Sequence, residues 1–146
     1  MQIVTIKLSQ ISGLHPASSE ILSATADLIY ASGPSDVNEE AIKLLADIHP
    51  VHVVPRGEKY QVVAGFRIYE LCKLLVPNDE IRCIVHQDMN KEKIKQLAEI
   101  DILGSPLVHS LGTKYVQQIR KLTRAIGNDN NLHLFPKLKS IRRICE

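Results

Sequence analysis

The stretch from residue 63 to 67, with the sequence VAGFR, has the residue types and spacing best suited to binding an anion. A β-branched run ends at Ala64, Gly65 interrupts it, and a helical pattern begins at once with Phe66 and Arg67. The first turn of a helix presents unpaired N–H groups and the positive end of the helix dipole to a phosphate. Glycine permits close approach to the backbone, and a guanidinium binds phosphate through its planar fork. We therefore predict a nucleotide- or phosphate-binding site at Gly65, Phe66 and Arg67.

A second interpretation of the same residues needs no ligand. Gly65 then only makes the turn between strand and helix, and Arg67 lies on a solvated helix face with Glu70 and Lys73. One glycine and one arginine do not decide between the two interpretations, so both stay open on the residues alone.

Basic residues are concentrated at the end of the chain. The formal net charge is +2, but residues 1–113 carry −4 and residues 114–146 carry +6. This asymmetry favours a polyanion such as DNA as a partner, although solvated surface charges would give the same pattern. The candidate nucleic-acid-binding residues are Lys114, Arg120, Lys121, Arg124, Lys137, Lys139, Arg142 and Arg143.

The remaining polar residues give no pattern typical of a catalytic or metal site. The six histidines are dispersed, and only His86 and Asp88 are spaced as a weak pair of metal ligands. We predict no catalytic residues and no metal. The three cysteines are odd in number and widely spaced, which favours reduced thiols in a cytoplasm. Cys72 and Cys83 fall on apolar-facing positions, so we predict that both are inert core residues.

Length and composition predict a globular protein. The chain has 146 residues, of which 45% are hydrophobic and 23% charged, the balance of an ordinary folded domain. No apolar run is long enough to span a bilayer, and residues 1–6 do not resemble a secretory signal. We therefore expect a soluble cytoplasmic protein that does not associate with membranes.

Hydrophobic periodicity predicts an α+β fold, with a small mixed sheet built around a hairpin and flanking helices. A first helix should end at Gly33 as a left-handed cap, and a capping box of Asp36 and Glu39 should start the next. Asn90 should cap a later helix, and residues 104–106 should form a loop. The expected strands are residues 2–8, 51–54, 60–64 and 81–85, and the expected helices are residues 16–32, 37–48, a segment from 66 that ends before 77, a segment from 91, 115–126 and 136–145. We expect a domain over residues 1–110 and a helical basic extension over residues 111–146.

The segment from residue 49 to 67, HPVHVVPRGEKYQVVAGFR, resembles the N-terminal domain of ParB, the chromosome and plasmid partition family, which shares its fold with sulfiredoxin. The shared pattern is a proline before a β-branched strand, a glycine turn, a tyrosine-bearing strand that ends in Ala-Gly, and a helix. The resemblance covers roughly residues 2–103. It implies the ParB/sulfiredoxin-like fold and a nucleotide as ligand, which is CTP in that family.

The sequence departs from the family at positions that matter for chemistry. Gly65 and Arg67 match the Gly-Glu-Arg-Arg box that holds the CTP phosphates, but Phe66 and Ile68 replace its other two members. The family's Glu-Asn-x-x-Arg motif would begin at Glu99, where both the Asn and the Arg are missing. Each lost charge-assisted contact costs about 1.5–3 kcal/mol, so we expect a triphosphate to bind weakly or not at all, and therefore no CTP hydrolysis. Phe66 also stands where sulfiredoxins carry their nucleophilic cysteine, which excludes that reaction.

The resemblance implies a ParB-like nucleotide-sensing or DNA-associated protein without enzymatic activity, of a partition or mobile-element system, and the basic charge of residues 114–146 is compatible with this. One alternative is a nucleotide hydrolase or nuclease of the same fold that acts at residues 65–67. Another is a protein–protein adaptor whose site is vestigial. Residues 127–135 are a long connection for a helix-turn-helix, so sequence-specific reading of DNA is not expected.

Overall fold

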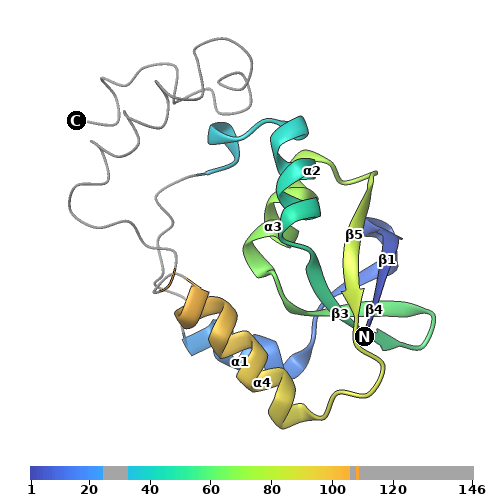
Figure 1. Cartoon of the computed structure of the whole chain (residues 1–146), viewed down its shortest axis with the longest axis vertical. Coiled ribbons are helices and arrows are strands. Elements are labelled where there is room, and N and C mark those ends of the chain that lie inside the picture. Colours follow the sequence, from blue (N-terminus) through green and yellow to red (C-terminus); the bar gives the residue numbers. More distant parts are fainter. Residues whose placement is uncertain (25–32, 106–107, 109–146) are drawn as a thin grey trace.

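A five-stranded mixed sheet with helices packed around it forms the folded body of the chain (Figure 1). The computed structural model describes residues 1–24, 33–105 and 108. The strands are β1 (Gln2–Lys7), β2 (Ile11–Leu14), β3 (Val51–Arg56), β4 (Lys59–Ala64) and β5 (Glu80–Val85), in the spatial order β1-β5-β3-β4-β2. β1 pairs antiparallel with β5, β5 parallel with β3, β3 antiparallel with β4, and β4 parallel with β2. The predicted α+β class with a mixed sheet is confirmed.

The helices are α1 (Pro16–Ala24), α2 (Glu39–Ile48), α3 (Phe66–Leu75) and α4 (Lys91–Glu99). Short 3₁₀ turns, η1 (Leu8–Gln10) and η2 (Pro34–Asp36), precede β2 and α2, and a π-helical turn, η3 (Ile100–Gly104), continues α4. Figure 1 shows α1 beside α4, and α2 beside α3. No helix in the described part of the chain is long and apolar enough to cross a membrane.

The predicted hairpin is confirmed and is tighter than expected. β3 and β4 are joined by the two residues Gly57 and Glu58, and Gly57 has a φ of 61°. The strands therefore extend further toward the turn than the apolar residues alone suggest, because Arg56 and Lys59 still pair across the hairpin. This hairpin lies in the middle of the sheet, with β5 beside β3, and β4 leads directly into α3.

The core lies between the sheet and the helices. Its fully buried members come from every strand except the short β2 and include Ile6, Val51, Val62 and Cys83. Burial raises the pKa of Cys72 to about 11 and that of Cys83 to about 12, which keeps both thiols protonated at neutral pH. Their predicted burial is confirmed, and their slow reactivity stays a prediction.

The predicted end of the first helix and the predicted start of the second differ from the structure. Gly33 is extended, with φ −118°, and is not a left-handed cap, because it precedes the turn η2. Asp36 does not open α2: its carboxylate accepts a hydrogen bond from the Gly33 N–H, at 2.7 Å. Asn38 is the N-cap instead, and its side-chain oxygen accepts from the N–H of Ala41 at 2.8 Å. Asn90 caps α4 in the same way, as predicted.

Two further expectations are corrected. The helical spacing of Val37, Ala41, Leu44, Leu45 and Ile48 predicts one apolar stripe on α2. However, Leu44 and Ile48 are 47% and 69% exposed, and the helix buries Ala41, Ile42 and Ala46. The expected loop at 104–106 begins with Gly104 inside η3. The predicted helices over 115–126 and 136–145, the end of the first helix beyond residue 24, and the extension from residue 111 lie outside the described residues.

Candidate functional site

Gly65 stands at the junction of β4 and α3, where the sequence predicts it, and the backbone there requires glycine. Its φ of 79° and ψ of 31° lie in the left-handed region. A Cβ at this position would come within 3.0 Å of the Cα of Val51 and 3.5 Å of the carbonyl oxygen of Pro50. The start of β3 therefore passes so close to the junction that a Cβ would be crowded against backbone atoms, which would have to shift. The close packing fixes where the first N–H groups of α3 point.

Those N–H groups converge on a carboxylate from a distant part of the chain. The Gly65 N–H donates to Oδ2 of Asp101 at 2.8 Å, and the Phe66 N–H donates to the same oxygen at 3.2 Å. A left-handed residue followed by a helical one turns successive N–H groups to one side, which makes a small anion-binding concavity. The donors predicted to hold a phosphate are thus arranged to hold an anion, and the anion in this structure is Asp101.

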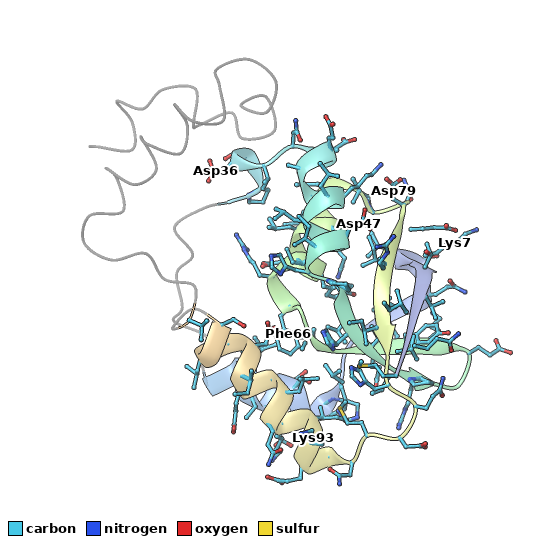
Figure 2. All side chains as sticks on the ribbon, in the orientation of Figure 1. Lys7, Asp36, Asp47, Phe66, Asp79 and Lys93 are labelled. Atoms are coloured by element: carbon cyan, nitrogen blue, oxygen red, sulfur yellow. The ribbon has the colours of Figure 1, made fainter. Side chains whose placement is uncertain are left out.

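Phe66 contributes its backbone N–H group to the site, whereas its side chain packs in the hydrophobic core. The ring is 6% exposed and belongs to the main hydrophobic cluster, which also contains Ala98 of α4 and Ile102 of η3. Figure 2 labels Phe66 at the start of α3. The ring therefore ties the start of α3 to the core, and only the N–H group of this residue faces an anion.

Arg67 satisfies parts of both interpretations that the sequence left open. Its guanidinium pairs with the carboxylate of Glu70, one turn further along α3, with an N–O distance of 2.5 Å. The side chain is 25% exposed, and it forms part of the wall of a pocket. Arg67 is therefore held near the helix start by Glu70 and still borders the space in front of Gly65.

That pocket has a volume of about 700 Å³ and lies between the end of α2, the start of α3 and the turn η3. Its polar groups come from Arg67, Asp101, Ser105 and two histidines, His49 and His52. Apolar side chains form the other walls, and these are Ile48, Pro50, Ile68, Leu97 and Ile100. Small-molecule sites typically have this size and this combination of apolar walls with a few polar groups. Ile48 and Ile100 lie at the rim of this pocket and are 69% and 64% exposed.

A pair of histidines stands beside the pocket, and sequence reasoning missed it. Nδ1 of His52 lies 2.9 Å from Nε2 of His86, and the two rings stack with centroids 5.2 Å apart. One ring donates and the other accepts. Burial lowers the pKa of His52, the neighbouring His86 lowers it further, and the Asp101 carboxylate opposes this. Burial also lowers the pKa of His86. The pairing of β3 with β5 brings together two residues that are 34 positions apart.

The other predicted residues do not join the site. His86 meets His52 and not Asp88, and no group of three or more potential metal ligands occurs within residues 1–24, 33–105 and 108. The eight basic candidates for DNA binding, from Lys114 to Arg143, lie outside the described residues. Asp101 was not predicted as part of the site. The signal in the sequence was weak: one acid lies between Ile100 and Ile102, in the segment where the family's Glu-Asn-x-x-Arg motif would fall.

Comparison with known proteins gives a similarity of fold. No protein-family model matches the sequence, and no curated protein matches it. Among solved structures, the chain is similar to the C-terminally truncated chromosome-partitioning protein ParB from Caulobacter crescentus, which was crystallised with CTP-γ-S, with a TM-score of 0.47 and 12% sequence identity. The match covers 81% of this chain and 59% of that chain, so it spans less than two-thirds of the ParB chain. The similarity concerns the fold alone.

Proposed function

We propose that this protein binds a phosphate-bearing ligand, a nucleotide, in the pocket at the start of α3 and that it does so without catalysing a reaction. The observation that carries the proposal is the pair of converging N–H groups of Gly65 and Phe66, which already hold an anionic oxygen at 2.8 and 3.2 Å. A phosphate oxygen, like that carboxylate oxygen, is negatively charged and accepts hydrogen bonds from N–H groups.

The surrounding pocket supports a ligand larger than phosphate. A volume of about 700 Å³ lies within the range of small-molecule sites. A phosphate at Gly65 would have Arg67 beside it, and the apolar walls from Ile48 to Ile100 suit the flat face of a base. The choice of a nucleotide, with CTP as the first candidate, comes from the resemblance of residues 49–67 to the partition family.

A second part of the proposal, association with DNA, rests on the charge of residues 114–146, which carry +6. This charge supports electrostatic binding to phosphates that is insensitive to base sequence. A nucleotide-sensing DNA-associated protein of a partition or mobile-element system would combine the two properties in one chain.

The test of ligand binding is a calorimetric titration of the wild type and Arg67→Ala with CTP, ATP and inorganic phosphate. Arg67→Ala removes the cationic side chain beside the donors, so we expect its affinity for the preferred nucleotide to fall about tenfold or more, since a charged hydrogen bond contributes roughly 1.5–3 kcal/mol. Thermal stability should barely change, because the ion pair that the variant loses involves the exposed Glu70. Lys73→Ala, on the same helix and outside the pocket wall, is the matched control.

The same experiment contains the outcomes that contradict the proposal. Absence of wild-type binding at millimolar ligand would leave the protein–protein adaptor as the better account. Equal binding by Arg67→Ala and wild type would place the ligand elsewhere. Release of nucleoside diphosphate or free phosphate during the titration would show a hydrolase, the enzymatic alternative.

A further inference from the structure

We propose that Asp101 is a built-in competitor for the pocket: its carboxylate occupies the backbone donors that a phosphate would use, so ligand binds only when Asp101 leaves. This inference rests on the proposed function and adds a regulatory contact to the same site. The structure is then the closed form of the protein, in which the site is held by the chain's own acid.

The geometry of the contact carries the inference. A single oxygen, Oδ2 of Asp101, accepts from both Gly65 and Phe66, at 2.8 and 3.2 Å. With both donors on one oxygen, neither of these two N–H groups is left for an external anion. A second anion would also lie within a few ångströms of the carboxylate, where like charges repel each other. Phosphate and Asp101 therefore exclude each other from the same position.

The contact is a tertiary one, and it is not part of the local structure of α3. Asp101 lies 35 residues after Phe66 and belongs to η3, the turn that follows α4. An ordinary helix N-cap is the residue at the helix start, but here that residue is Gly65, which has no side chain. Asp101, which belongs to a separate element, therefore caps the start of α3. A contact between two elements can open without unfolding either of them.

The element that carries Asp101 is suited to such an opening. In η3 the Ser105 N–H donates to the carbonyl of Ile100, five residues earlier, which is the hydrogen bond of a π turn. Such turns are rare within helices and occur often at functional sites. Ile100 and Leu103 are 64% and 56% exposed, whereas Ile102 is 8% exposed and joins the core. Ile102 therefore anchors the turn while little packing holds the two residues on its outer side.

Competition of this kind has a quantitative consequence. When the binding-competent form is a minor population, the apparent dissociation constant rises by the inverse of that population. Removing Asp101 makes every molecule competent, so the ligand should bind more tightly to the variant than to the wild type. A merely structural cap predicts the opposite, because its loss would loosen the start of α3 and weaken any site there.

The experiment is a calorimetric titration of the full chain with inorganic phosphate and with pyrophosphate at fixed salt. We expect Asp101→Ala to bind at least tenfold more tightly than wild type. Asp101→Asn should fall between the two, since the amide oxygen still accepts the N–H groups but no longer repels an anion. Asp79→Ala is the control: it also removes one paired carboxylate, from the ion pair with Lys43, but Asp79 does not line the pocket and lies well away from Phe66 in Figure 2. It should bind as wild type does.

The outcomes separate this inference from the proposed function. Equal or weaker binding by both Asp101 variants, with measurable binding by wild type, would overturn the competitor and leave the nucleotide site standing. No binding by any variant would overturn both. Should Asp101→Ala fail to fold, Asp101→Asn and a second measurement on wild type decide: the ¹³C resonance of the Asp101 carboxyl must shift as phosphate saturates the protein, and an unshifted resonance would overturn the inference.

Discussion

Gly65 shows at the scale of one residue how the site depends on backbone geometry. Its left-handed φ of 79° and the 3.0 Å approach of Val51 Cα act together, so Gly65→Ala should lower the free energy of unfolding by about 1–3 kcal/mol. Gly57→Ala should lower the free energy of unfolding only through the left-handed φ of 61°, because no atom lies within 4 Å of the new Cβ. Gly33→Ala should have neither the conformational nor the steric cost, because Gly33 is extended and no atom lies within 4 Å of the new Cβ. Urea unfolding should rank the three in that order, and a Gly65→Ala variant as stable as Gly33→Ala would contradict it.

The sequence predicted Gly65 and Arg67 in their places, because a glycine between a β-branched run and a helical pattern is a local signal. It could not predict Asp101 at the same site. The hydrogen bonds from Gly65 and Phe66 to that acid join residues 36 and 35 positions apart, and no spacing rule connects them. The histidine pair was invisible for the same reason: β3 and β5 must first be known as neighbours.

Strands and helices were predicted well where their apolar pattern is regular. The alternation of Ile81, Cys83 and Val85 gave β5, and the paired β-branched runs gave the hairpin. β2 was not predicted, since Ser12 and Gly13 interrupt its alternation and only two of its residues pair with β4. The predicted apolar stripe of α2 was wrong at Leu44, whose side chain is exposed to solvent, and at Ile48, which borders the pocket.

The His52–His86 pair, which joins β3 to the residue that follows β5, gives a prediction at the scale of these elements. Burial lowers the pKa of both rings in the folded state, while an unfolded chain titrates near pH 6.5. As the pH falls from about 7.5 to about 5.5, the unfolded chain takes up protons that the folded chain does not, so the free energy of unfolding should decrease. The double variant His52→Gln/His86→Gln should reduce this dependence, as measured by urea unfolding at several pH values. A double variant with the full wild-type slope would show that the acid sensitivity arises in other groups.

At the scale of the whole molecule, the chain combines an anion-binding junction in the folded body with a basic segment after residue 113. DNA binding through that segment stays a prediction. It should be electrostatic, so the dissociation constant for a duplex should rise more than about tenfold between about 50 and 200 mM salt. Deleting residues 133–146 removes Lys137, Lys139, Arg142 and Arg143 and should weaken binding while the body stays folded. Fluorescence anisotropy with two unrelated duplexes measures this, and a salt-independent affinity or a strong preference for one duplex would contradict it.

The central claim is that a nucleotide binds with its phosphate at the start of α3. The most direct measurement is a ¹H–¹⁵N titration of the full chain with CTP, in which the amide signals of Gly65 and Phe66 report on the donors themselves. We predict that these two signals shift most, together with that of Arg67, and that all three saturate with one dissociation constant. Shifts centred on other residues, or unchanged Gly65 and Phe66 signals at millimolar CTP, would contradict the claim.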